Sequence, residues 1–319
     1  MPAKGAAMRC CWWVSLYVGL ASILSGQIHR SINQHAYGIR TVPAEGVPAG
    51  LAVTAIAASG SRSLALTSDG TAWGWGGNAV LPMRVGRVAD ATAVALGDSH
   101  TVALKGDGTV WAWGANSEGQ LGDGTTATRA TPVQVSGLTG VTAVAAGGPH
   151  TLALKGDGTV WAWGGTYGYG YSSLPQSAPA QVRGLTWVSG VAAGPGYSLA
   201  VKFDGTVWQW GPYGSGTPAQ VTGLTGVVAI ATTGGYGLAL KSNGTVCEWR
   251  IDAQYSFPPA VQVSELSDVT SLAAARWGGH RLALKRDGTV WAWGSNYHGQ
   301  LGNGAISSDP YESSRPAQV

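Results

Sequence analysis

The stretch Asp107-Gly108-Thr109-Val110-Trp111-Ala112-Trp113-Gly114 decides the fold because it recurs along the chain of 319 residues. Identical copies begin at Asp157 and Asp287, and looser copies begin at Asp69, Asp204 and Asn243. Neighbouring copies are 38 to 50 residues apart, a spacing typical of repeat proteins. We therefore expect one domain built from six similar units, where length alone would suggest two domains.

One unit predicts four short strands. Residues 141–146 and 150–155 are apolar runs separated by Gly-Gly-Pro, and Asp157-Gly158 then predicts a hairpin into a third strand at 159–163. A fourth strand with an early proline follows in several units, at residues 131–135, 178–182, 217–221 and 259–263. Proline suits an edge strand, since its missing N–H removes no ladder hydrogen bond there.

The strands are apolar almost throughout, which predicts sheets that are covered on both faces. Four-stranded sheets stacked around an axis meet this condition. The sequence thus predicts an all-β fold, a β-propeller of four-stranded antiparallel blades.

Residues 103–122 closely resemble the repeat of the regulator of chromosome condensation (RCC1) family. Residues 283–302 match equally well, including Asn296 and the run Gly299-Gln300-Leu301-Gly302. The resemblance covers residues 51–319 and implies a propeller, usually of seven blades. We interpret the chain as an exported, bacterial-type member of this family.

Six units favour six blades, with a seven-bladed ring that contains one incomplete blade as the alternative. The chain stops at residues 315–319, which match the proline-containing strand. We expect this terminal strand to complete the first blade and close the ring. Residues 41–45 are a rival for the same place.

The N-terminus has a different character. Lys4 and Arg9 precede an apolar run over residues 10–24, and small residues follow it. This pattern is typical of a secretory signal, and the run is shorter than a usual membrane-spanning helix. We expect residues 1–26 to be a signal peptide, or alternatively an N-terminal anchor, and residues 27–50 to be a linker or an N-terminal extension. The protein is therefore expected to be exported, touching a membrane only through an uncleaved N-terminal segment.

Composition limits the partners and the chemistry. Charged residues make up 11% of the chain, the formal net charge is +3, and Lys and Arg form no stripe, so nucleic acid is not an expected partner. We expect a monomer that binds a protein. Of the three cysteines, Cys247 alone lies outside the N-terminal segment. It occupies the position of Trp111 in its own unit, which indicates buried packing rather than a disulfide or zinc site.

Catalysis has no candidate residues in the sequence. His100, His150 and His280 share one repeat position with Arg62, Tyr197 and Tyr236, so we expect them to bond the local loop backbone rather than to bind one metal ion. The repeated aspartates belong to turns. The sequence holds no nucleophile elbow, phosphate loop or zinc-protease motif. We expect no cofactor, no metal and no enzymatic activity.

The segment between the third and fourth strands changes completely from unit to unit. Several of these segments are rich in Tyr, Gly and Ser, the composition of binding loops. The paired tryptophans are interpreted as packing between blades, whereas Trp187 and Trp277 break the pattern. The predicted partner-binding residues are Tyr167, Tyr169, Tyr171, Tyr213, Tyr255, Phe257, Tyr297, Tyr311, Trp187 and Trp277.

These features predict an exported, non-enzymatic scaffold for protein–protein interaction. The resemblance implies one alternative, guanine-nucleotide exchange on a small GTPase. The family's exchange factors use a wedge inserted between strands, and this sequence has no matching insertion. A second alternative is a cell-surface glycan-binding module that uses Trp187, Trp277 and the tyrosine-rich segments.

Overall fold

The computed structural model describes residues 51–76, 79–165, 176–211, 217–251, 259–275, 279–307 and 314–319. These residues form six four-stranded antiparallel sheets, which confirms the all-β propeller and its six blades. The predicted signal or anchor (1–26) and linker (27–50) lie outside the described residues. No helix among the described residues is long and apolar enough to cross a membrane.

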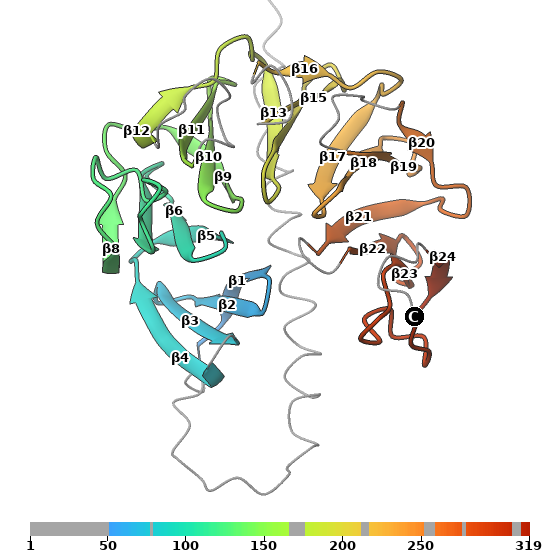
Figure 1. The fold of residues 1–319 in the computed structure, drawn as a ribbon, viewed down its shortest axis with the longest axis horizontal. Coiled ribbons are helices and arrows are strands. Elements are labelled where there is room, and N and C mark those ends of the chain that lie inside the picture. Colours follow the sequence, from blue (N-terminus) through green and yellow to red (C-terminus); the bar gives the residue numbers. More distant parts are fainter. Residues whose placement is uncertain are drawn as a thin grey trace, which may run out of the picture.

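Each blade consists of four strands that are consecutive in the chain, here called its strands a to d from the inside outward (Figure 1). Blades 1 and 2 contain β1 (Val53–Ser59), β2 (Arg62–Thr67), β3 (Thr71–Gly76), β4 (Ala79–Arg87), β5 (Ala91–Leu96), β6 (His100–Lys105), β7 (Val110–Gly114) and β8 (Arg129–Gln134). Blades 3 and 4 contain β9 (Val141–Ala146), β10 (His150–Lys155), β11 (Val160–Gly164), β12 (Gln176–Gln181), β13 (Val188–Ala193), β14 (Ser198–Lys202), β15 (Val207–Trp210) and β16 (Ala219–Gln220). Blades 5 and 6 contain β17 (Val227–Thr232), β18 (Tyr236–Lys241), β19 (Val246–Arg250), β20 (Val261–Gln262), β21 (Val269–Ala274), β22 (His280–Lys285), β23 (Val290–Gly294) and β24 (Ser314–Gln318).

The Asp-Gly turns form the predicted hairpins. In blade 3, β10 pairs with β11 so that Leu154 faces Val160 and Ala153 faces Trp161. Gly158 adopts φ 79°, a left-handed conformation that glycine takes without steric cost. The same conformation recurs at the corresponding glycine of every hairpin, which explains why the Asp-Gly or Asn-Gly pair is repeated.

The hydrophobic core lies between blades, not at the centre of the molecule. Trp163 of blade 3 is fully buried and packs in one cluster with Val102 and Leu104 of blade 2. Trp293 of blade 6 packs in the same way against Leu238 of blade 5. Burying about 200 Å² of indole surface contributes up to about 5 kcal/mol at each such contact. The interpretation of the paired tryptophans as packing residues is therefore confirmed for the second tryptophan of each described pair in blades 2, 3, 4 and 6.

The expected closure by the terminal strand is wrong. The C-terminal β24 pairs with β23 and completes blade 6, while β4 completes blade 1. In Figure 1 the blades follow one another in an arc, and the first blade (blue) stands apart from the last (red). Val290 of blade 6 is 38% exposed, whereas Val160 at the same position of blade 3 is fully buried. The difference follows from position, because blade 3 has a further blade packed on that face.

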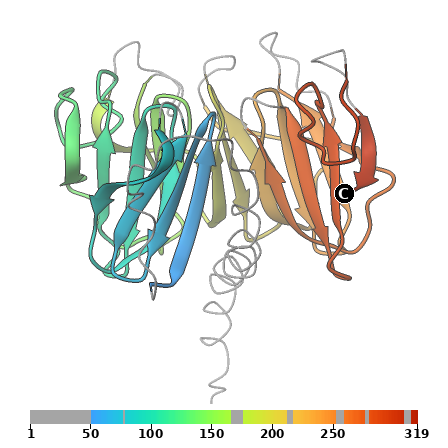
Figure 2. The same ribbon diagram turned by 90° about the horizontal axis from the view of Figure 1, so that it is seen from below.

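The strands of all blades run between two rims of the molecule (Figure 2). One rim carries the Asp-Gly hairpins that join strands b and c, and we call it the hairpin rim. The other rim is where the c strands end, and we call it the c–d rim. Since every c strand runs in the same direction, all c–d segments leave the scaffold on one rim.

Candidate functional site

The aspartates of the hairpins are structural. Asp157 Oδ1 accepts hydrogen bonds from the amide N and the hydroxyl of Thr159, at 2.9 and 2.6 Å. The Thr159 hydroxyl is the main cause of the lowered pKa of Asp157. In blade 1, Asp69 also accepts from the Thr67 hydroxyl, and its pKa falls to about 2. A carboxylate held ionised in this way closes its turn and is a poor general acid.

The histidines at the start of the b strands connect neighbouring blades. His100 Nε2 lies 2.9 Å from Thr151 Oγ1 in the next blade, and His150 Nε2 lies 3.1 Å from Ser198 Oγ in the blade after that. The Thr151 hydroxyl donates its proton to the carbonyl of Gln120 at 3.0 Å, so it accepts from His100, which must carry a proton on Nε2.

Other residues at this position make the same connection. Arg62 Nη2 donates to the Gly97 carbonyl at 2.8 Å, and the Tyr197 hydroxyl bonds to Thr233. The expectation that these side chains bond only their local loop is thus corrected, because their bonds cross to the following blade. No group of three metal-ligating side chains occurs within the described ranges.

Cys247 is buried, as expected from its repeat position. Burial raises the pKa of its thiol, which makes the thiolate scarce. This cysteine therefore packs in the core as a largely protonated thiol.

Two c–d segments are described over most of their length, and both are built around an asparagine. Asn116 Oδ1 accepts from the amide of Leu121, and its Nδ2 donates to the carbonyls of Thr125 and Ala127. Asn296 makes two matching bonds in blade 6, accepting from the amide of Leu301 at 3.0 Å and donating to the carbonyl of Ala305 at 3.0 Å. The two segments thus share one backbone frame.

Within that shared frame the exposed side chains differ. Tyr297 is 48% exposed and stands where blade 2 has Ser117. Its ring meets His298 edge to face, with ring centroids 4.9 Å apart. Because Ser117 serves the same backbone equally well, the tyrosine is not required to form the loop. Tyr297 is the predicted partner-binding residue that the structure places on the c–d rim.

Trp187, the other described residue of the predicted set, lies on the hairpin rim. It precedes β13 and is 74% exposed, so the structure does not bring it together with Tyr297. The remaining eight lie outside the described residues: Tyr167, Tyr169, Tyr171, Tyr213, Tyr255, Phe257, Tyr311 and Trp277.

Sequence reasoning missed Phe203, which is 66% exposed beside Trp187. The Phe203 amide donates to the Trp187 carbonyl at 2.9 Å. A signal for it was available in the repeat, because the corresponding hairpin position holds Gly106, Gly156 and Ser242 in other blades.

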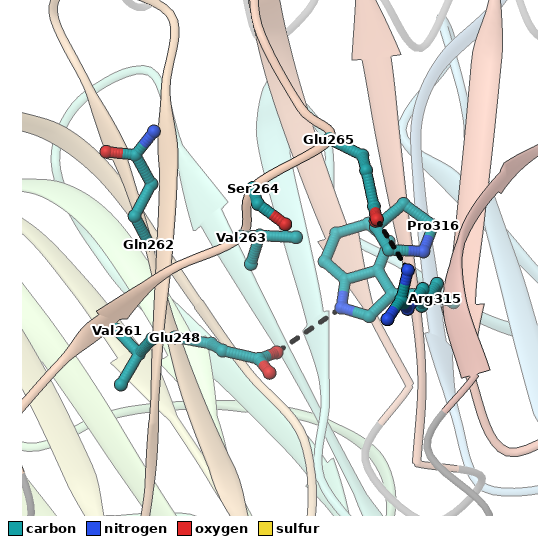
Figure 3. Close-up of a pocket in the computed structure, with 9 residues that line it drawn as sticks. Glu248, Val261, Gln262, Val263, Ser264, Glu265, Arg315 and Pro316 are labelled. Carbon is teal, nitrogen blue, oxygen red and sulfur yellow. Dashed lines mark hydrogen bonds and ion pairs between the residues drawn. The ribbon is translucent and has the colours of Figure 1, made fainter.

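A pocket of about 320 Å³ lies between the outer strands of blades 5 and 6 (Figure 3). Its Glu248 accepts from the indole Nε1 of Trp293 at 3.3 Å and lies 3.6 Å from the buried Arg281. At its edge Glu265 pairs with Arg315 at 3.7 Å. Each of these two carboxylates is thus paired with an arginine.

Fold and surface together define a propeller of RCC1-type repeats in which the hairpin aspartates close turns and the histidines His100 and His150 link neighbouring blades. Two models described as "Regulator of chromosome condensation (RCC1) repeat" match the chain, one at residues 107–154 and 287–319, the other at 53–80, 91–120 and 141–168. The chain therefore contains RCC1 repeats. Comparison with curated proteins gave no match.

Solved structures of the same fold include human WBSCR16, with 22% sequence identity over 85% of this chain and 82% of that chain, at a TM-score of 0.70. Prp20p from Saccharomyces cerevisiae has 20% identity over 83% of this chain and 76% of that chain, at a TM-score of 0.66. The binding of Prp20p to Gsp1p and histones is described together with its structure. The TM-scores establish a common fold, and sequence identities this low establish no more than that.

Proposed function

We propose that this protein is an exported, non-enzymatic scaffold that binds a partner protein through its c–d rim. The observation that carries the proposal is the pair of matched segments in blades 2 and 6. The same asparagine-centred frame presents Ser117 in one blade and the half-exposed Tyr297 in the other. On this rim the same backbone conformation thus carries different exposed side chains, as in binding loops carried by a rigid framework.

The physical properties of the rim suit protein recognition. Tyrosine offers a large amphipathic surface at low entropic cost, because only two side-chain torsions have to be fixed. The blades beneath are held by buried tryptophans and by hydrogen bonds from blade to blade, so the c–d segments of blades 2 and 6 leave a pre-organised scaffold.

The test uses the full chain expressed in the cells that produce it. We expect affinity capture from the cell surface and the culture fluid to enrich a partner, and the enrichment to fall with the combined change of Tyr167, Tyr169, Tyr171 and Tyr297 to Ser. A matched control changes Ser117 to Ala on the same rim and should capture normally. If the enrichment of the partner is the same with and without the tyrosine changes, binding through this rim is refuted. A chain found only in the cytosol would refute export.

The RCC1 repeats of this chain support one competing function, nucleotide exchange on a small GTPase. A direct assay separates the two. Exchange activity predicts that the chain accelerates release of bound guanine nucleotide from a GTPase of the producing cell, whereas the scaffold proposal predicts a release rate equal to that of the GTPase alone.

A further inference from the structure

The hairpin rim carries an aromatic pair that the repeat does not require. In every blade the amide of a residue just after strand b donates to the carbonyl of a residue just before strand a, at 2.8 to 3.0 Å. Five blades fill this pair of positions with small or charged residues: Ala52 and Ser68, Asp90 and Gly106, Gly140 and Gly156, Gly226 and Ser242, Asp268 and Arg286. Blade 4 fills it with Trp187 and Phe203.

The backbone at this position is unfavourable for tryptophan. Trp187 adopts φ 60°, in the left-handed region, where Gly140 and Gly226 adopt 69° and 67°. Bulky side chains are rare in this region, and strained residues of this kind concentrate at functional sites. The fold therefore tolerates Trp187 but gives no reason for choosing it.

Both rings are open to a ligand. Trp187 is 74% and Phe203 is 66% exposed, and neither makes a ring or cation contact with another residue in the described part of the chain. By contrast, the Nζ atom of the neighbouring Lys202 lies 4.5 Å from the centroid of the Trp208 ring, so the cation of Lys202 contacts that ring and not Trp187 or Phe203.

A third departure from the repeat occurs in the same place. Arg183 lies exposed on the turn that leads to Trp187, where other blades have Ser136, Thr222 and Ser264. It forms no ion pair with any described residue. Arg183 is thus an exposed cation on the turn that leads to the aromatic pair.

We propose that Arg183, Trp187 and Phe203 form a second protein-binding site, separate from the c–d rim. Its partner presents an apolar pocket for the aromatic rings and a carboxylate for Arg183. Tryptophan and arginine are the typical anchors of such contacts. An anionic membrane fits less well, because exposed aspartates such as Asp107, Asp157 and Asp287 occupy the same rim. With two binding rims, the scaffold would bridge two proteins.

The test places the photoreactive amino acid benzoylphenylalanine at position 203 of the full chain, in the cells that produce it. A matched chain carries it at position 242, the same hairpin position one blade further on. We expect a discrete protein adduct from position 203, at least tenfold weaker from position 242. Trp187→Gly and Arg183→Ser, which restore residues typical of the repeat, should each reduce the adduct at least fivefold while Tyr297→Ser leaves it unchanged.

The thermal midpoint of each variant serves as the control for unfolding. For Trp187→Gly it should stay within a few degrees of the parent chain, because glycine is native at the corresponding position of other blades. Equal adducts from both positions, adducts only with lipid, or no protein adduct from position 203 would each overturn the proposal. The cross-link at position 203 does not involve the c–d rim. Its result is therefore independent of the capture experiment that tests binding through the c–d rim.

Discussion

Replacing Thr151 by Val tests whether the hydrogen bonds between blades stabilise the propeller. Thr151 is fully buried, accepts from His100 of the preceding blade and donates to the Gln120 carbonyl. Valine keeps the shape but removes the hydroxyl. The Gln120 carbonyl retains the indole N–H of Trp163 at 3.0 Å, so the main loss falls on His100.

A buried donor that loses its acceptor costs about 1–3 kcal/mol. For a domain of this size, that corresponds to a fall in the unfolding midpoint of about 2–10 °C. The repeat supplies a matched control in Thr101, which is also buried but makes no hydrogen bond through its hydroxyl to a described residue. Thr101→Val should change the free energy of unfolding by less than about 0.5 kcal/mol.

The assay is thermal and denaturant unfolding of both variants, followed by tryptophan fluorescence. A double-mutant cycle with His100→Ala should yield a coupling of about 1 kcal/mol between the two residues. If Thr151→Val and Thr101→Val have equal effects, the bond between blades contributes nothing, and the assignment of these histidines as structural links is wrong.

Three further outcomes follow from the packing, the electrostatics and the c–d rim. Gly237→Ala should lower stability by about 1–3 kcal/mol, because a Cβ there would lie 2.1 Å from the buried ring of Trp249, whereas Gly235→Ala meets no atom within 4 Å and should be neutral in denaturant unfolding. The carboxyl group of Asp69 has a pKa of about 2 in the folded protein and about 3.9 in unfolded chains. Its ionised form should therefore stabilise the protein fully above about pH 4, and this stabilisation should be lost as the pH falls towards 2. NMR titration of the carboxyl group checks the pKa. Tyr297→Ser should leave the thermal midpoint unchanged and weaken partner binding, and a large fall in the midpoint would show that the ring is structural.

The repeat made the scaffold predictable. The Asp-Gly pair specifies a hairpin through local backbone preference, and the last tryptophan of each unit meets corresponding neighbours of the preceding blade in blades 2 to 6. Both are local or repeated interactions, so one unit predicts the next. Cys247 could be assigned to the core for the same reason.

Features that depend on the ends of the chain or on single blades were harder to predict. The segment ending at Val319 matches the fourth strand of a unit equally well whether it completes the first blade or the last, and only its pairing with β23 decides. The exposure of Phe203 is not evident from its own unit, because an aromatic residue directly after an apolar strand is usually buried. The bonds of His100 and His150 cross between blades, which the sequence of one unit does not reveal.

The central claim is that the c–d rim binds a protein partner while the blades only hold it in place. It is tested most directly by the dissociation constant of the captured partner for a chain in which residues 295–307 are replaced by residues 115–127 and Tyr167, Tyr169 and Tyr171 are changed to Ser. Both exchanged segments have the same length and the same asparagine-centred frame, so the thermal midpoint should not change. We expect the partner to bind at least tenfold more weakly; an unchanged dissociation constant would contradict the account.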